Sequence, residues 1–435
     1  MYKFSKYNSI IPLSESISAL YNSKEDKCLV IKKDIESYFQ LPTDYLERHH
    51  PTIYKDLLEI NAIIEEQTDE LQEVIKRSKA VDYADTSYRL IINPTMNCNF
   101  KCWYCYESHI VGSKMSNDGV EKIFKFIDKT LSNNKNLTSF DLSFFGGEPL
   151  MYYSKVTEPI INYYRTKYEE YPDINFLISF TTNGYLLNDK MLHHLTFEDD
   201  EKFFQITLDG SREEHNKVRV AQKEEGSYDK IISSIKKLLN EKINVLIRIN
   251  YTAENIDSTK LIVDDLGDIP EENKQYLSIS FHQVWQDIEI NDIDHKVKEV
   301  MEVFKKHQLI PEGEEIELIE GLANPCYADK KNEAVINYNG DVYKCTARDF
   351  TEDNKYGTLN NDGEIEWNEK IVTWETLKIQ SKACQNCRIL PLCGGGCHQI
   401  NLEAKGLNIC QMGYDSAKKD EIIMNRLSKL FFHEA

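Results

Sequence analysis

The residues with the clearest chemistry in this 435-residue chain are its eleven cysteines, which fall into two groups and one isolated residue. Three form a Cys-x3-Cys-x2-Cys run at Cys98, Cys102 and Cys105, seven lie between residues 326 and 410, and Cys28 stands alone. An odd number of closely spaced cysteines argues against disulfides and for ligation of a soft metal or a metal cluster, because such metals prefer thiolates. We expect Cys28 to be an ordinary buried residue.

The first group places three thiolates on one short loop. Three thiolates can hold three irons of a cubane cluster and leave the fourth iron open. A zinc ion normally takes a fourth protein ligand, and His109 is the nearest residue that could supply it. Spacing alone therefore leaves zinc as an alternative to an iron–sulfur cluster.

This run resembles the signature of the radical S-adenosylmethionine (SAM) superfamily, Cys-x3-Cys-x-φ-Cys, with Tyr104 at the aromatic position φ. The resemblance implies that Cys98, Cys102 and Cys105 ligate a [4Fe-4S] cluster whose open iron binds SAM. It further implies that one electron from the cluster cleaves SAM and yields a 5′-deoxyadenosyl radical.

Other segments fall where this family places its SAM-binding residues. Gly146, Gly147, Glu148 and Pro149 match the GGEP segment that binds the methionine amino group, although alone they could form a simple turn. The remaining positions with family counterparts are Thr182 and Asn183, then Asp209 in a stretch ending at His215, then Arg248 and Asn250. Ordinary turn and strand-end roles are the alternative for this last set.

The second group comprises Cys326, Cys345, Cys384, Cys387, Cys393, Cys397 and Cys410. Its spacing is similar to that of the SPASM domain, which is found in radical SAM enzymes that modify peptides and proteins. The resemblance implies an outer auxiliary [4Fe-4S] cluster on Cys384, Cys387, Cys393 and Cys410. It also implies an inner one on Cys326, Cys345 and Cys397, which makes three clusters in all. The inner set is one ligand short: either a residue such as Asp329 completes it, or its iron is open to a substrate thiolate.

Alternating strands and helices must position the first cysteine loop. Strand-like runs occupy residues 89–92, 140–145, 176–180, 203–208, 245–250 and 277–281. Helical patterns lie between them, best seen after Ser116, a predicted N-cap, and over residues 231–239. Parallel β/α units bind ligands at the carboxyl ends of their strands. We therefore expect an α/β fold whose core, residues 86–308, is a partial (β/α)6 radical SAM barrel.

Smaller domains are expected on either side of this core. Residues 1–85 contain strand-like runs followed by helical patterns, which fit a small α+β, winged-helix-like domain. In peptide maturases such a domain binds a leader peptide by strand addition; a simple packing extension is the alternative. We expect residues 309–412 to form the SPASM domain, with a type I′ hairpin turn at Asn339-Gly340, and residues 413–435 to form a C-terminal helix.

Charge and hydropathy narrow the function classes. The formal net charge of −20 and the lack of a basic arm disfavour binding to nucleic acid. No apolar run approaches the roughly 18–20 residues that a membrane span needs, and the N-terminus does not read as a signal peptide. We therefore expect a cytoplasmic protein without membrane association.

The family resemblances imply a radical SAM oxidoreductase that acts on a ribosomally synthesised precursor peptide, leader plus core. The expected product is a thioether or carbon–carbon crosslink, and the expected electron donor is a protein such as flavodoxin or ferredoxin. One alternative is an anaerobic sulfatase-maturing enzyme, but those enzymes place a catalytic Asp after the cysteine where this chain has Thr346. The other is a non-catalytic metal-binding interaction protein. No catalytic acid or base is assigned from the sequence.

Overall fold

The computed structural model describes residues 1–198, 200–221, 226–287, 293–309, 319–404 and 407–432. The chain divides into two compact units, each described here by itself. The core unit comprises residues 85–315 and 332–369, and the terminal unit comprises residues 1–84, 316–331 and 370–435. Within the described part of the chain, no helix is both long and apolar enough to cross a membrane.

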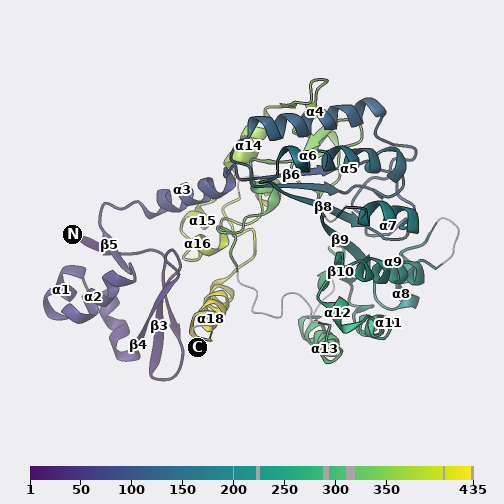
Figure 1. The fold of residues 1–435 in the computed structure, drawn as a ribbon. Coiled ribbons are helices and arrows are strands. Elements are labelled where there is room, and N and C mark those ends of the chain that lie inside the picture. Colours follow the sequence, from purple (N-terminus) through teal and green to yellow (C-terminus); the bar gives the residue numbers. More distant parts are fainter. Residues whose placement is uncertain (199, 222–225, 288–292, 310–318, 405–406, 433–435) are drawn as a thin grey trace. The chain divides into compact units, whose positions relative to one another are not determined.

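The core unit is built on a ten-stranded sheet in the order β11-β10-β9-β8-β7-β6-β12-β13-β14-β15 (Figure 1). The parallel strands are β6 (Ser87–Ile92), β7 (Ser139–Phe144), β8 (Asn175–Thr182), β9 (Glu201–Leu208), β10 (Asn244–Tyr251), β11 (Leu277–Gln283) and β12 (Glu333–Ile336). The antiparallel strands that follow are β13 (Asp341–Tyr343), β14 (Gly357–Leu359) and β15 (Ile365–Trp367). The sheet is mixed and open, so the predicted α/β fold with an incompletely closed parallel barrel is confirmed.

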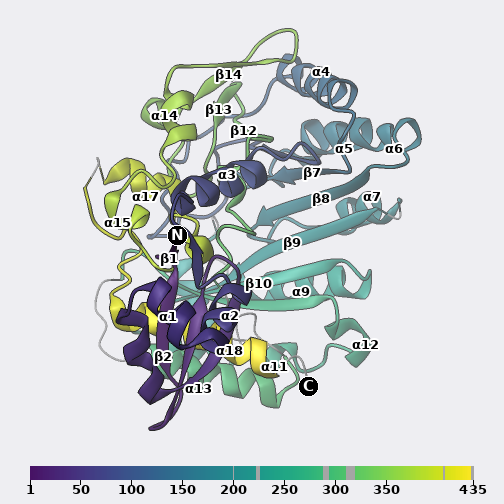
Figure 2. The same ribbon diagram turned by 90° about the vertical axis from the view of Figure 1, so that its left-hand side faces the viewer.

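Side chains alternate along the parallel strands, and this alternation separates an apolar face from a polar one. In β9, Phe204, Ile206 and Leu208 are buried, whereas Gln205 and Thr207 are only half-buried on the opposite face. The apolar face shares one hydrophobic core with the helices that cover it, α4 (Asn117–Asn133), α5 (Thr157–Arg165), α7 (Asp189–Thr196) and α9 (Tyr228–Asn240) (Figure 2). The polar face is therefore available for a ligand.

The N-terminus of α4 is set by a capping residue. The side chain of Ser116 accepts a hydrogen bond from the amide of Gly119, so the predicted N-cap of α4 is confirmed.

The remaining helices of the core unit are α6 (Lys167–Glu170), α8 (Arg212–Val218), α10 (Ile256–Thr259), α11 (Ile262–Leu266), α12 (Glu271–Lys274) and α13 (Ile293–Lys306), with short 3-10 turns η2 (Tyr153–Lys155) and η4 (Glu352–Asn354).

The predicted type I′ turn between β12 and β13 is wrong. Only Gly340 has a positive φ, of +87°, and its amide donates to the carbonyl of Asn337. The amide of Asn337 in turn donates to the carbonyl of Asp341. This is a type I turn followed by a left-handed glycine, which spares Asn339 the positive φ that a two-residue turn would impose. The hairpin extends the core sheet, because β12 pairs in parallel with β6.

The terminal unit contains a three-stranded antiparallel sheet of β2 (Asn8–Pro12), β3 (Ile17–Asn22) and β4 (Lys27–Lys32), together with the strand pair β1 (Tyr2–Phe4) and β5 (Ile63–Glu65). One face of the sheet packs on α1 (Thr43–His49) and α2 (Pro51–Glu59). The other packs on α18 (Ser416–Phe432), where the expected C-terminal helix is confirmed. The other elements are η1 (Lys33–Gln40), α3 (Glu70–Asp82), η3 (Tyr327–Asp329), α14 (Lys370–Thr376), α15 (Lys382–Gln385), α16 (Leu390–Cys393) and α17 (His398–Glu403).

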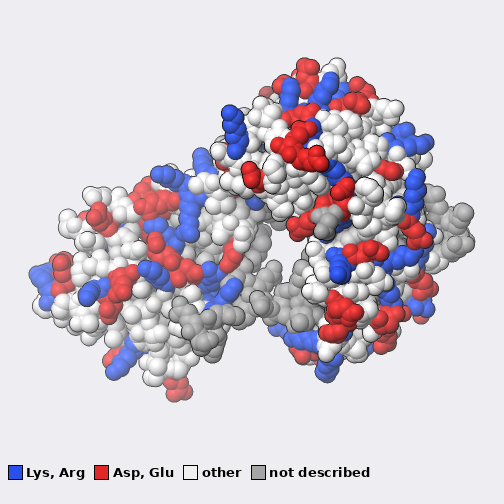
Figure 3. All heavy atoms as spheres, viewed as in Figure 1, with Lys and Arg blue, Asp and Glu red and all other residues white. Residues whose placement is uncertain are grey.

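Surface charge is mixed rather than segregated. On the face drawn in Figure 3, acidic and basic side chains are interspersed over both units, with no continuous basic stripe. The sequence as a whole holds 52 Lys and Arg and 72 Asp and Glu residues.

Candidate functional site

The first cysteine loop opens onto a cavity of about 190 Å³ on the polar face of the core sheet. Cys98, Cys102 and Cys105 all line this cavity, together with Tyr104 from the same loop. The other walls come from the carboxyl ends of neighbouring strands: Gly146 and Gly147 after β7, Thr182 and Asn183 at β8, Gln205 and Thr207 in β9, Arg248 and Asn250 in β10, and Gln283 in β11. The structure thus brings most of the predicted SAM-binding residues around the three cysteines.

The two glycines are required by the close approach of two backbone segments. Gly146 has a φ of +90°, and a Cβ on it would lie 2.7 Å from the carbonyl oxygen of Thr95. A Cβ on Gly147 would lie 2.3 Å from the carbonyl oxygen of Asn97. Any side chain at either position would displace the segment that leads into Cys98.

Glu148 does not reach the cavity. Its carboxylate is fully buried and accepts hydrogen bonds from the hydroxyl of Thr182 at 2.6 Å, from the amide of Asn183 at 2.8 Å and from the amide of Leu150 at 3.0 Å. Burial raises the pKa of Glu148, and these bonds oppose the shift. Glu148 therefore holds the end of β8 in place, and neither it nor Pro149 is among the lining residues.

Tyr104 is the hub of a buried polar network in the wall of the cavity. Its hydroxyl donates to Asp209 at 2.5 Å and accepts from Arg219 at 2.8 Å and from Asn250 at 3.1 Å. Asp209 and Arg219 also form a buried ion pair, in which Asp209 is 1 % and Arg219 9 % exposed. Asp209 therefore lies behind Tyr104 and acts on the cysteine loop through it.

Sequence reasoning missed several residues of the site. The sequence around Arg219 shows only a cation between two valines, which is a weak indication of a functional residue. Gln205 and Thr207 alternate with apolar residues along one strand, and this pattern could have placed both of them on the polar face of the sheet. Glu107 and Trp285 also line the cavity. Burial raises the pKa of Glu107 to about 8, and the nearby carboxylates of Asp349 and Glu148 add to the shift.

Aromatic and cationic groups stack at this edge of the cavity. The rings of Tyr106 and Trp285 are stacked at 5.7 Å between centroids, and the guanidinium of Arg348 lies 5.5 Å from the Trp285 ring. Trp285 is 57 % exposed. Such a ledge offers flat apolar area and a fixed cation to an incoming substrate.

His215 has a structural position outside the cavity. It is fully buried, its Nδ1 accepts from the amide of Asp209 at 3.3 Å, and its Nε2 lies 3.1 Å from the hydroxyl of Ser227. The imidazole therefore ties the turn after β9 to the start of α9.

The three cysteines of the loop are the ligands that a [4Fe-4S] cluster with one open iron would require. Burial raises the pKa of all three thiols, that of Cys105 to about 11, and coordination by iron would remove these protons outright. His109, the alternative zinc ligand, has its Nε2 3.6 Å from the Cys105 sulfur. Among the described residues, no three His, Cys, Asp or Glu side chains converge as the ligands of one metal ion.

The second cysteine group is divided between the two units. Cys384, Cys387, Cys393 and Cys410 lie together in the terminal unit, where burial and then the charges of the other three raise the pKa of Cys384 to about 11. Cys326 and Cys397 belong to the terminal unit and Cys345 to the core unit.

Asp329 is already engaged by other side chains. Its Oδ1 lies 2.5 Å from Nδ1 of His398, and its Oδ2 lies 3.2 Å from the ammonium of Lys378. Both carboxylate oxygens of Asp329 therefore have a partner among the side chains of the terminal unit.

Comparison with known proteins identifies the core. Residues 92–266 match the model of the Radical SAM superfamily. The chain is 25 % identical over 351 residues to a cysteine-type anaerobic sulfatase-maturating enzyme of Clostridium novyi, which covers 72 % of this chain and 88 % of the relative. It is 24 % identical over 369 residues to the radical SAM cyclopropyl synthase TigE of Paramaledivibacter caminithermalis, covering 76 % and 71 %.

Solved structures share the fold. The structure of anSMEcpe with bound AdoMet superposes with a TM-score of 0.56 at 19 % identity, over 79 % of this chain and 98 % of that one. Streptococcus suis SuiB bound to precursor peptide SuiA gives a TM-score of 0.52 at 15 % identity, over 94 % of this chain and 100 % of that one.

Proposed function

We propose that this radical SAM enzyme oxidatively crosslinks a ribosomally synthesised precursor peptide, joining a substrate carbon to a cysteine sulfur or to a second carbon. The observation that carries the proposal is the extent of the structural matches. The match to peptide-bound SuiB covers 94 % of the chain, whereas that to anSMEcpe covers 79 %. A fold that extends over almost the whole chain supports a peptide maturase.

The terminal unit offers a surface for a leader peptide. β4 is an edge strand whose only neighbour in the described sheet is β3, and edge strands bind extended peptides by main-chain hydrogen bonds. Val30 on β4 is 52 % exposed, so a leader side chain could pack against it. We assign leader binding to residues 1–85 on this basis.

The residues of the cavity have distinct proposed roles. Cys98, Cys102 and Cys105 would hold a [4Fe-4S] cluster, which with bound SAM supplies reductive cleavage to a radical that takes a hydrogen atom from substrate. The backbone at Gly146 and Gly147 and the side chains of Thr182, Asn183 and Arg248 would bind SAM. Tyr104, Asp209 and Arg219 hold the loop rigid, and the ledge of Tyr106, Trp285 and Arg348 would orient the peptide.

Crosslinking removes one hydrogen atom and then a further electron and proton from the substrate. The second cysteine group would hold two auxiliary clusters, which provide an acceptor for that electron. Asp329 is bonded to Lys378 and His398, so we do not count it among the ligands of the inner cluster. Flavodoxin or ferredoxin would supply the electron for SAM cleavage.

Sulfatase maturation is the second candidate, favoured by the similarity to the Clostridium novyi enzyme. The residue types and contacts at two positions count against it. The position after Cys345 is Thr346, whose carbonyl accepts from the Tyr106 hydroxyl at 2.7 Å. Asp349, the nearest Asp, is bonded to Ser108, with its Oδ1 accepting from the amide at 2.8 Å. Its carboxylate is thus engaged rather than positioned as a base.

Anaerobic co-expression with short cysteine-containing peptides encoded beside the gene tests the proposal by mass spectrometry. We expect loss of two hydrogens per crosslink, with alkylation-resistant cysteines for a thioether and reactive ones for a carbon–carbon bond. The Cys98→Ala, Cys102→Ala, Cys105→Ala variant should release no 5′-deoxyadenosine. Formylglycine on a sulfatase peptide, with precursor peptides unchanged, would establish the second candidate instead. Stoichiometric zinc without iron would exclude both.

Leader binding is tested separately with Val30→Glu on the β4 edge. We expect at least about tenfold weaker binding of the leader peptide, because a charge replaces an apolar contact at the docking edge. Val372→Glu is the matched control, since Val372 is 63 % exposed on α14, away from the sheet. Equal binding by the two variants would place the leader elsewhere.

A further inference from the structure

Tyr7 has a buried hydroxyl with no hydrogen-bond partner among the described residues. The residue is 0 % exposed and is one of the largest fully buried side chains in the chain. Buried hydroxyls are nearly always bonded, because an unpaired one forfeits its interaction with water. The position therefore calls for an acceptor that the described residues do not supply.

The surroundings of Tyr7 indicate what that acceptor is. Its ring belongs to a small apolar cluster of the terminal unit, against which Cys384 and Cys387 pack. Burial, then the charges of Glu70 and Asp69, and then the Cys387 thiolate raise the pKa of Tyr7. An iron–sulfur cluster held by these cysteines would bring its sulfur atoms into this apolar region. These sulfur atoms are the acceptors that we expect for the Tyr7 hydroxyl.

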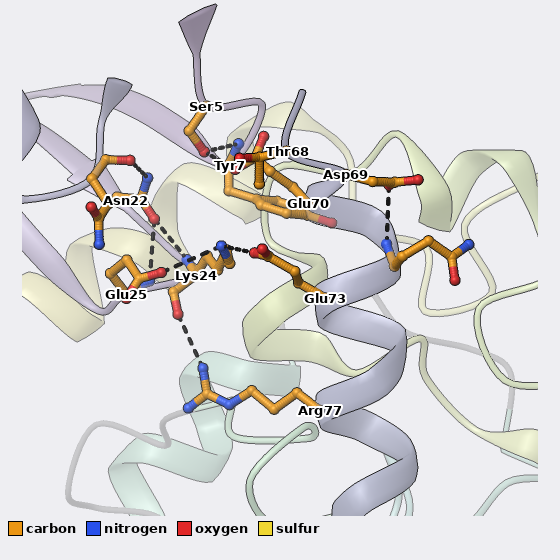
Figure 4. Close-up of polar contacts among 12 residues, drawn as sticks. Ser5, Tyr7, Asn22, Lys24, Glu25, Thr68, Asp69, Glu70, Glu73 and Arg77 are labelled. Atoms are coloured by element: carbon orange, nitrogen blue, oxygen red, sulfur yellow. Dashed lines mark hydrogen bonds and ion pairs between the residues drawn. The ribbon is translucent and has the colours of Figure 1, made fainter. Parts of the chain in front are cut away.

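A network of hydrogen bonds fixes the backbone at Tyr7. The amide of Tyr7 donates to the hydroxyl of Ser5 at 3.2 Å, and this hydroxyl donates to Oε1 of Glu70 at 2.5 Å (Figure 4). The other oxygen of Glu70 accepts from the amide of Lys6 at 3.0 Å. Glu70 is itself 5 % exposed and begins α3. The network therefore fixes the backbone at Tyr7, and the apolar cluster around the ring holds the side chain.

The same N-terminal segment holds the cysteine turn from the outside. The ammonium of Lys6 donates to the carbonyl of Gln385 at 3.1 Å, and the hydroxyl of Ser23 donates to the carbonyl of Arg388 at 2.5 Å. The guanidinium of Arg388 donates to the hydroxyl of Ser9 at 3.0 Å. Both sides of Cys387 are therefore attached to residues 6–23.

We infer that Tyr7 donates a hydrogen bond to a sulfur of the outer auxiliary cluster, at or beside Cys387, and is thus part of that cluster's site. The inference rests on the proposed assignment of Cys384, Cys387, Cys393 and Cys410 to this cluster. Hydrogen bonds to cluster sulfurs tune the reduction potential, and a donor stabilises the more negative, reduced state. Tyr7 therefore raises the potential of the outer cluster.

The test compares Tyr7→Phe with the parent in the Cys98→Ala, Cys102→Ala, Cys105→Ala background, which retains only the auxiliary clusters. Redox titration followed by electron paramagnetic resonance should show one of two potentials shifted to a lower value at unchanged iron content. The matched control is Tyr54→Phe, because Tyr54 is buried in a cluster of the same unit that contains no cysteine. Potentials that do not differ between Tyr7→Phe and the control would overturn the inference.

A second measurement detects the proton itself. Electron–nuclear double resonance of the reduced auxiliary clusters in H₂O and D₂O should show exchangeable protons, among them those of the amides of Gly395 and Gly396 beside Cys393, and Tyr7→Phe should lose one of these signals. An unchanged set of signals in Tyr7→Phe would refute the hydrogen bond. Iron analysis of Cys384→Ala tests separately whether these cysteines hold the outer cluster. Four fewer irons per chain would support the cluster. An unchanged iron count would mean that these cysteines hold none.

Discussion

The hydroxyl of Tyr104 and the carboxylate of Asp209 are joined by a 2.5 Å hydrogen bond across 105 positions of sequence. The bond connects the cysteine loop to the carboxyl end of β9, and Arg219 completes the contact from the far side. The aromatic residue of the loop thus has a polar function: its hydroxyl attaches the loop to the sheet.

The Arg219→Met variant tests this attachment. Removing the cation leaves the Asp209 carboxylate buried without its partner, so we expect a loss of about 3–5 kcal/mol in the free energy of unfolding. The double variant Asp209→Asn, Arg219→Met should recover part of it. Chemical denaturation measures both. Arg212→Met is the control, since Arg212 is 54 % exposed and should cost less than about 1 kcal/mol; equal losses in the two single variants would contradict the assignment.

Gly147→Ala should disturb the cysteine loop without unfolding the chain. The new Cβ would lie 2.3 Å from the carbonyl oxygen of Asn97, and relief of this overlap is expected to cost about 1–3 kcal/mol. We expect reduced iron at the first cluster and weaker SAM binding. Gly267→Ala is the control, because its Cβ would meet nothing closer than 3.4 Å. Full SAM affinity in Gly147→Ala would show that the close approach is not needed.

Glu148→Gln should weaken SAM binding although Glu148 lies outside the cavity. An amide turns an NH₂ group toward at least one of the three donors that now bind the carboxylate, at a cost of about 1–3 kcal/mol. Displacement of Thr182 and Asn183 should then lower SAM affinity by about tenfold. Equilibrium dialysis measures this affinity. The exposed Glu213 provides the control substitution to Gln.

Stability should fall as pH rises through neutrality because of Glu333. Burial raises the pKa of this carboxyl to about 7, although Lys344 lies 3.1 Å away and opposes the shift. A folded-state pKa above the unfolded value means that the folded state binds the extra proton. The contribution of Glu333 to stability is therefore greatest below about pH 4.5 and declines by up to about 3 kcal/mol as pH rises to about 7.

The Glu333→Gln variant cannot titrate at this position, so its free energy of unfolding relative to the parent should rise between pH 5 and pH 8. Urea denaturation at several pH values measures the difference. A flat difference would mean that Glu333 is ionised throughout this pH range.

Local patterns in the sequence predicted the elements of the core. The strands carry buried residues at alternate positions, as Phe204 and Ile206 do, and Ser116 caps its helix as its type suggests. Non-local partners could not be predicted in this way. The pairing of β12 with β6, the ion pair of Asp209 with Arg219, and the inward turn of Glu148 all depend on chain segments brought together only by folding. The turn at Gly340 was mispredicted because Asn-Gly also suits a longer loop.

β12 pairs in parallel with β6, with Ile336 opposite Ile92. The cysteine-rich region therefore contributes a strand to the core sheet and is not an independent domain that can be removed intact. A chain cut before residue 332 would leave β6, the strand that leads into the first cysteine loop, with an unpaired edge. Such an edge is a template for association with another chain. Attempts to express the core alone, or to exchange the cysteine-rich region between relatives, should therefore move β12 to β15 together with the barrel and place the junction elsewhere.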